Sequence, residues 1–123
     1  MAVVVDASAL AAVLFAEPGH ESVARQLRGQ EMHAPTLIDY ELASVALKKL
    51  RRVPADAEAL LAALHTARRL RLERRHPDMV QVLALAASTG LTTYDASYLW
   101  MARWLGVKLV TLDRGLEKAA EGI

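Results

Sequence analysis

Four short segments of the chain have the hydrophobic pattern of β-strands. The two clearest are predominantly apolar and rich in β-branched residues, which is typical of buried strands, and each leads into an aspartate. A third run is closed by Pro35, and the fourth shows only a two-residue alternation of apolar and basic positions. The predicted strands are Ala2–Val5, Met32–Ala34, Arg69–Leu72 and Val107–Leu112.

The segments between these strands carry apolar residues at three- and four-residue spacing, which predicts helices. Proline or glycine stands at most of their ends. Strands that alternate with helices indicate an α/β protein with a mostly parallel sheet, and 123 residues suit one domain, 1–123. The predicted helices are Ser8–Glu17, His20–Leu27, Thr36–Arg51, one opened by Pro54 and Asp56, Pro77–Gly90, Asp95–Leu105 and Asp113–Glu121.

Composition removes several classes of function. The chain has 15 basic and 14 acidic residues, a formal net charge of +1, which argues against binding duplex DNA through a general positive field. It has no cysteine, so disulfide scaffolds, thiolate zinc sites and cysteine nucleophiles are excluded. The longest uncharged stretch, Met79–Tyr94, is shorter than the roughly 20 apolar residues of a membrane-spanning helix, and the chain lacks the basic start of a signal peptide. We therefore expect a soluble cytoplasmic protein with no membrane contact.

Acidic residues are the most informative candidates for chemistry, because glycine-rich phosphate loops are absent and the four histidines lack metal-ligand spacing. Asp6 and Asp113 each follow a predicted strand, at the edge where open α/β sheets bind ligands. Asp95 opens an otherwise apolar helix, and Glu41 has apolar residues at i−4, i−3 and i+4. Each aspartate is also a favourable helix cap, so each is either a cap or a ligand-binding residue. If the four acids converge, their repulsion demands a hard cation such as Mg²⁺ or Mn²⁺.

Four motifs, in order along the chain, resemble those of PIN domains. Val5–Ser8 is similar to the family's D-x-S opening, and Pro35–Glu41 to the helix that carries a second acid. The segment Thr92–Leu99 resembles the element with the third acid, and Leu109–Asp113 resembles the "vTlD" strand with the fourth. Their order and spacing are similar to those of VapC-like members, the toxin ribonucleases of toxin–antitoxin pairs. The resemblance implies a three-layer α/β/α fold with a central, mostly parallel sheet.

The same resemblance implies a Mg²⁺- or Mn²⁺-dependent endoribonuclease inhibited by a separately encoded VapB-like antitoxin. The catalytic residues that it implies are Asp6, Glu41, Asp95 and Asp113, of which Asp6, Asp95 and Asp113 are the metal ligands. Ser8 and Thr111 are the implied hydrogen-bonding supports of this site. Asp39 is a rival to Glu41, which we prefer for its spacing and apolar neighbours, and Glu117 is a possible fifth acid. Relatives commonly continue into a further short strand, whereas this sequence runs to Ile123.

Basic and aromatic residues indicate how the chain could bind RNA or a second copy of itself. Aromatic residues make up 5% of the chain, which argues against extensive base stacking. The apolar helix that contains Trp100 and Trp104 favours a homodimer, although burial in the core also explains most of it. Two basic groups are either solvated faces or phosphate contacts: Lys48, Lys49, Arg51 and Arg52, and Arg68, Arg69, Arg71, Arg74 and Arg75.

Two other functions remain as alternatives to the ribonuclease. One is a PIN-like domain that binds RNA or a partner without cleavage, against which four intact acids argue. The other is a receiver-type phosphoacceptor module, which requires an acidic pair after the first strand, whereas Asp6 stands alone there.

Overall fold

A parallel four-stranded sheet forms the centre of the computed structural model, which describes residues 1–122; Ile123, the last residue of the expected domain, lies outside this part. The strand order is β3-β2-β1-β4, and every neighbouring pair is parallel, with Val4 opposite His33 and Leu109. Val3, Val4 and Val5 are buried, as a strand covered on both faces requires. The strands are β1 (Ala2–Val5), β2 (Glu31–Pro35), β3 (Leu72–Arg75) and β4 (Lys108–Val110).

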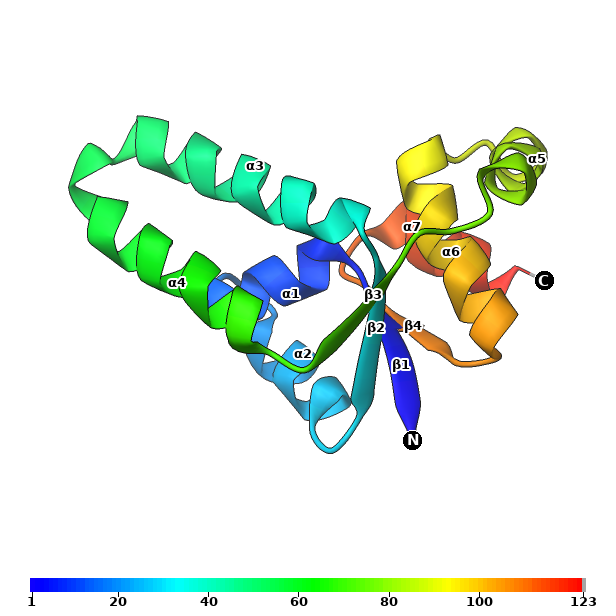
Figure 1. Ribbon diagram of the computed structural model, residues 1–123, viewed down its shortest axis with the longest axis horizontal. Coiled ribbons are helices and arrows are strands. Elements are labelled where there is room, and N and C mark those ends of the chain that lie inside the picture. Colours follow the sequence, from blue (N-terminus) through cyan, green and yellow to red (C-terminus); the bar gives the residue numbers. More distant parts are fainter. Residues whose placement is uncertain (123) are drawn as a thin grey trace.

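Helices cover both faces of the sheet, which confirms the expected three-layer α/β/α architecture. In Figure 1 the sheet is seen between α1–α4 on one side and α5–α7 on the other. Helices α3 and α4 form a long antiparallel pair joined by the 3₁₀ turn η1, Pro54–Asp56 (Figure 1). The helices are α1 (Ala7–Leu14), α2 (His20–Leu27), α3 (Leu37–Arg52), α4 (Ala57–Arg69), α5 (Met79–Thr89), α6 (Thr93–Leu105) and α7 (Arg114–Glu121).

Helix α6 is apolar on most of its surface because it lies inside the molecule. It packs on β1, β2 and β4 and is flanked by α5 and α7. Tyr98, Leu99 and Met101 are each almost fully buried. Burial therefore accounts for most of the apolar character from which an interface was expected. Within residues 1–122, no helix has both the length and the apolar character needed to span a membrane.

Several element boundaries differ from the sequence prediction, most clearly those of the third strand and the first helix. The third strand is Leu72–Arg75 and not Arg69–Leu72, because α4 continues through Arg69 and the inward positions of the strand are Leu72 and the half-buried Arg74. The first helix ends at Leu14 and not Glu17. Ala16 adopts a positive φ of 52°, and the Glu17 amide bonds to the Ala12 carbonyl at 2.9 Å. A proline disfavours the helical conformation of the residue before it, which agrees with the position of Glu17 outside the helix.

Candidate active site

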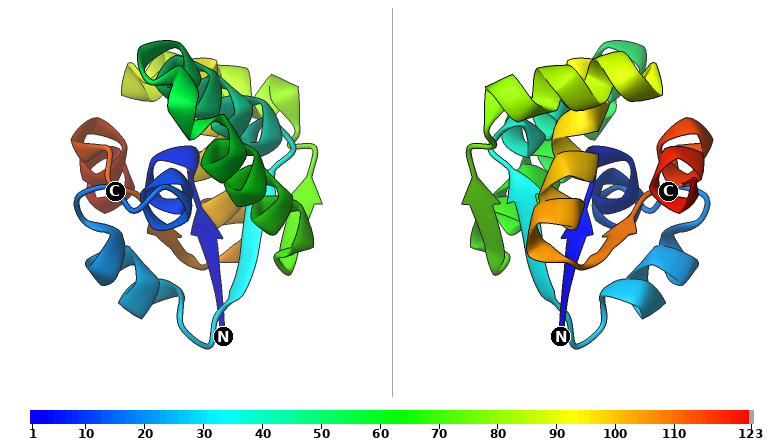
Figure 2. Two further views of the ribbon diagram at one scale, coloured as in Figure 1. Left: turned by 90° about the vertical axis from the view of Figure 1, so that its left-hand side faces the viewer. Right: turned by 90° about the vertical axis from the view of Figure 1, so that its right-hand side faces the viewer.

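The four acidic residues singled out in the sequence line one cleft. Asp6 follows β1, and Asp113 comes shortly after β4, so both lie at the carboxyl edge of the parallel sheet, toward which the visible strand arrows point in Figure 2. Glu41 is on α3 and Asp95 is in the first turn of α6. All four border a cleft of about 300 Å³. The fold thus brings together residues that are as far apart as 107 positions, 113 minus 6, in the sequence.

Asp6 is the most buried and most firmly held of these acids. Its Oδ1 accepts hydrogen bonds from the Ala9 amide at 2.9 Å and the Ser8 hydroxyl at 2.8 Å, and its Oδ2 accepts one from Thr111 at 2.5 Å. Burial nevertheless raises its pKa above the usual value of an aspartate; the three hydrogen bonds oppose this, and the nearby charge of Asp113 adds to it. Asp6 is therefore a rigid anchor for the cleft.

The turn after β4 is organised by the hydroxyls of Ser8 and Thr111. The Leu112 amide donates to Ser8 Oγ at 3.0 Å, and the Asp113 amide donates to Thr111 Oγ1 at 3.0 Å. These bonds divert the chain from the sheet, which explains why β4 ends at Val110 rather than at the predicted Leu112. The hydroxyls that hold Asp6 thus also hold the turn that carries Asp113.

Two of the three aspartates in the cleft are helix caps, and the third is not. Asp6 caps α1, and Asp113 caps α7 by accepting from the Leu116 amide at 2.9 Å. Thr92 caps α6, accepting from the Asp95 amide at 3.1 Å, so the Asp95 carboxylate has no capping role. Asp6 and Asp113 therefore cap helices and also line the cleft. The helix N-termini at this edge also favour negative charge.

Glu41 is held by a tyrosine that the sequence analysis did not assign to the site. The hydroxyl of the buried Tyr98 donates to Glu41 Oε1 at 2.5 Å. Burial raises the pKa of Glu41, the Tyr98 hydrogen bond lowers it, and the charges of Asp95 and Asp6 raise it further. Burial and the interaction with Glu41 raise the pKa of Tyr98 well above its usual value, so its hydroxyl stays protonated and remains a donor.

Mutual repulsion is the common electrostatic feature of the cleft. The pKa of Asp95 is raised by burial and then by the charges of Asp113 and Asp6. An all-carboxylate donor set of this kind suits a hard divalent cation. As the side chains stand, however, no three Asp, Glu, His or Cys residues within the described part are arranged as ligands of one ion. A shared ion therefore requires side-chain movement, most readily of Asp95, whose carboxylate is the least restrained.

Helical spacing identifies further residues of the cleft. Ser44 and Lys48 lie three and seven positions after Glu41 on α3 and line the cleft, as does Tyr98, three positions after Asp95 on α6. The same spacing in the sequence was a usable signal for all three. Of the residues in the two basic groups, Lys48 lines the cleft and the arginines do not.

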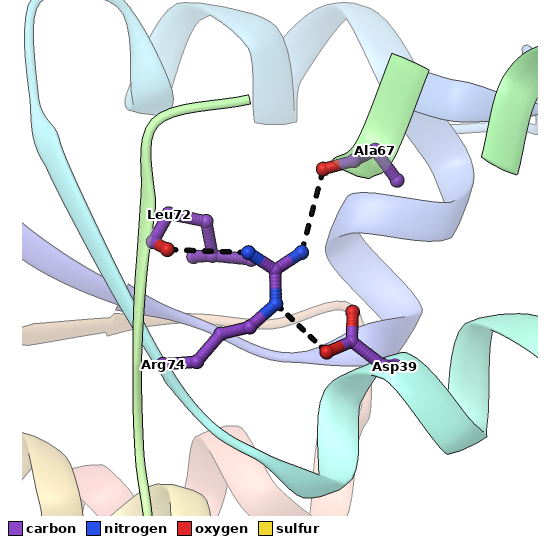
Figure 3. A network of polar contacts seen from close by, with 4 residues as sticks. All are labelled: Asp39, Ala67, Leu72 and Arg74. Carbon is purple, nitrogen blue, oxygen red and sulfur yellow. Dashed lines mark hydrogen bonds and ion pairs between the residues drawn. The ribbon is translucent and has the colours of Figure 1, made fainter. Parts of the chain in front are cut away.

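The two further acids considered in the sequence lie elsewhere. Asp39 Oδ2 pairs with Arg74 Nε at 2.8 Å, and the Arg74 guanidinium also donates to the carbonyls of Leu72 and Ala67, at 3.3 and 3.4 Å (Figure 3). This network joins α3, β3 and the end of α4, outside the cleft. Glu117 borders a different hollow, together with Arg103 and Lys108. The preference for Glu41 over Asp39 therefore agrees with the placement of these side chains.

Comparison with known sequences gives matches over nearly the whole chain. Residues 3–122 match the PIN domain family. The chain is 36% identical over 121 residues to Ribonuclease VapC3 of Pyrobaculum aerophilum, and the alignment covers 94% of this chain and 92% of that protein. It is 33% identical over 121 residues to Ribonuclease VapC12 of Mycobacterium tuberculosis, covering 95% and 91%.

Solved structures show the same fold. PAE2754 from Pyrobaculum aerophilum matches with a TM-score of 0.73 and 28% identity, over 99% of this chain and 87% of that one. VapC20 of Mycobacterium tuberculosis, a toxin described as cleaving the sarcin–ricin loop, matches with a TM-score of 0.69 over 96% and 95%. Its identity is 15%, so this likeness concerns the fold alone. The match over residues 3–122 and relatives above 30% identity show that the chain belongs to the PIN domain family.

Proposed function

We propose that the protein is a Mg²⁺- or Mn²⁺-dependent endoribonuclease, the toxin of a toxin–antitoxin pair in the cytoplasm. The observation that carries this proposal is the convergence of Asp6, Glu41, Asp95 and Asp113 on one cleft, where burial and then neighbouring negative charge raise the pKa values of Asp6, Glu41 and Asp95. Two relatives that cover more than nine-tenths of the chain bear the name ribonuclease, which supports RNA as the substrate.

The residues of the cleft divide the chemistry among them. Asp6, Asp95 and Asp113 would hold a divalent ion, which would supply Lewis-acid activation of water and stabilisation of charge on the leaving oxygen. Glu41, with its raised pKa and its hydrogen bond from Tyr98, is the carboxylate placed to accept a proton from the attacking water. Lys48 supplies a positive charge at the border of the cleft, where it contacts a phosphate of the RNA.

A cleavage assay with matched acidic variants tests this function. We expect the purified protein to cut labelled single-stranded RNA with Mg²⁺ or Mn²⁺ and not with EDTA. Asp6→Asn and Asp95→Asn abolish cleavage, whereas Asp39→Asn, which removes an acid outside the cleft, retains it. Cleavage by both cleft variants at the wild-type rate contradicts the proposal. A folded wild-type protein that binds RNA without cutting it supports the non-catalytic alternative.

A VapB-like antitoxin is the partner that this function requires, because an uncontrolled ribonuclease harms its host. We propose a flexible antitoxin tail that buries apolar residues beside the cleft and places a basic side chain against Asp6 and Asp95, where it competes with the metal. Ordering such a tail costs entropy, so tight binding needs considerable apolar burial. Raising Mg²⁺ a hundredfold then weakens antitoxin binding, as measured by titration, and an unchanged affinity contradicts this mode of inhibition.

We also propose a homodimer, now with α5 as the interface. Trp100 and Trp104, which motivated the expectation, stack on each other with ring centroids 5.4 Å apart. The most exposed aliphatic side chains on a helix are instead Val80 and Leu83 of α5, at 81% and 63%. Adjacent exposed apolar residues of this size are typical of an interface. Light scattering at tens of micromolar shows a dimer that Leu83→Glu dissociates; a monomeric wild-type protein contradicts this.

A further inference from the structure

A second hollow lies beside the acidic cleft. It has a volume of about 210 Å³ and is bordered by the end of β2, the start of α3, the β3–α5 connection and the start of α6. We propose that this hollow, the tyrosine pocket, binds one unpaired nucleobase of the RNA that is cut in the cleft. The inference rests on the proposed ribonuclease function and adds to it a site that determines which base stands next to the cut.

The tyrosine pocket and the cleft are formed by the same two helices. On α3, Leu37 and Tyr40 border the pocket, and Glu41, the next residue, borders the cleft. On α6, Tyr94 borders the pocket and Asp95 the cleft. Successive residues of a helix are rotated by about 100°, so the two sites occupy adjacent faces of both helices. A strand of RNA that reaches the carboxylates can therefore also place a base in the pocket.

Aromatic side chains give the pocket its chemical character. Tyr40 and Tyr94 are 78% and 62% exposed, and within residues 1–122 the third exposed aromatic residue is Trp104, which lies elsewhere. Exposed tyrosines that border a hollow offer ring faces on which a base can stack, and stacking accepts any base. This location is unusual in a chain with so few aromatic residues, and it differs from the aliphatic hollow between α3 and α4, lined by Leu42, Leu64 and Ala67.

The polar groups of the pocket suit a base edge rather than a phosphate or a metal. His76 and Thr36 supply a ring nitrogen and a hydroxyl that form hydrogen bonds, and the residues that line the pocket include no acid and no lysine or arginine. Without carboxylates, the pocket does not repel RNA as the neighbouring cleft does. Its small volume admits one base and not a helical segment of a protein. We therefore infer a nucleobase as the occupant.

Binding of RNA by tyrosine variants tests the pocket directly. The probe is a fluorescein-labelled single-stranded RNA of mixed sequence, and anisotropy is read in an Asp6→Asn background so that the RNA stays intact. Stacking on one aromatic residue contributes about 1–3 kcal/mol, so Tyr40→Ala or Tyr94→Ala weakens binding by about 5- to 140-fold. Tyr40→Phe and Tyr94→Phe, which keep the ring, stay within about twofold. Trp104→Ala, which removes an exposed ring outside the pocket, leaves the affinity unchanged.

Sequencing of cleavage products separates base recognition from a general loss of binding. The protein with an intact Asp6 shows a base preference at one fixed position relative to the cut, and Tyr40→Ala and Tyr94→Ala lose it. Unchanged affinity and preference in both variants overturn the pocket while the ribonuclease stands. A wild-type protein that does not cleave, but whose RNA affinity falls in these variants, retains the pocket and refutes the proposed function. A loss of dimer mass with Tyr40→Ala assigns the pocket to a subunit interface and overturns it.

Discussion

Replacing Glu41 by glutamine should stabilise the metal-free protein while removing its activity. The substitution keeps the size of the side chain, and the amide oxygen still accepts the hydrogen bond from Tyr98. It removes a half-buried negative charge that Asp95 and Asp6 repel. Glu41 lies in the second turn of α3, so its charge contributes little to the interaction with the helix dipole. The variant therefore isolates the electrostatic cost of the cleft.

The size of the gain follows from linkage between protonation and folding. Because Glu41 is only half buried, solvent screens the repulsion, and we expect a gain of about 0.5–1 kcal/mol at neutral pH. Because the folded-state pKa is raised, the native protein holds the proton more tightly than the unfolded chain. The destabilisation by the charge is complete above the folded-state pKa and disappears below about pH 4, where both states are protonated.

Urea denaturation and thermal unfolding, both in EDTA at neutral pH and near pH 4, measure this gain. We expect Glu41→Gln to raise the free energy of unfolding at neutral pH, with an increase in Tm of about 2–4 °C, and to match the wild type near pH 4. Glu73→Gln, an exposed glutamate of β3 outside the cleft, serves as the control and stays within about 0.5 kcal/mol at both pH values. A neutral-pH loss of stability in Glu41→Gln, or a gain that persists near pH 4, refutes the reasoning.

Three further outcomes are expected. Thr111→Val lowers the free energy of unfolding by about 2–3 kcal/mol in urea, because Asp6 loses a donor and the Asp113 amide loses its acceptor; a loss below about 0.5 kcal/mol contradicts these bonds. Arg74→Met and Asp39→Asn show a coupling of about 0.5–1 kcal/mol in a double-mutant cycle, since the pair is partly exposed, and additive effects contradict the ion pair. Mg²⁺ at a hundred times its Kd stabilises the wild type by about 2.7 kcal/mol and EDTA reverses this, so a Tm that Mg²⁺ leaves unchanged argues against a bound ion.

The fold was largely predictable because its signals are local. Short segments rich in β-branched and other apolar residues identified β1 and β4, and Gly90 and Gly106, both with positive φ, end α5 and α6 where the sequence indicated. The misplaced third strand has a different cause. Its inward side chain Arg74 is charged, and its position is favourable because it pairs with Asp39, which is distant in sequence, and donates to the carbonyls of Leu72 and Ala67. A pattern of apolar residues cannot report a position that a tertiary ion pair stabilises.

The site was predictable in its acids but not in the groups that hold them. Strand ends and the inward face of a helix identified Asp6, Asp113 and Glu41 as neighbours. Tyr98 was missed because an apolar helix around it offers burial as a sufficient explanation, and its bond to Glu41 spans 57 positions. Asp39 and Glu41 were separable only by their environments, since both lie on α3 two positions apart. Long-range polar contacts of this kind have no periodic trace in a sequence.

Mn²⁺ binding followed by electron paramagnetic resonance tests the central claim that the cleft carboxylates together hold a divalent cation. Bound Mn²⁺ loses the sharp signal of the free ion, so a titration counts sites and measures affinity. We predict that the wild-type protein binds Mn²⁺ in the absence of RNA, that Asp6→Asn and Asp95→Asn each weaken this binding at least tenfold, and that Asp39→Asn binds as the wild type does. Equal Mn²⁺ affinity in the wild type, Asp6→Asn and Asp95→Asn would contradict the account.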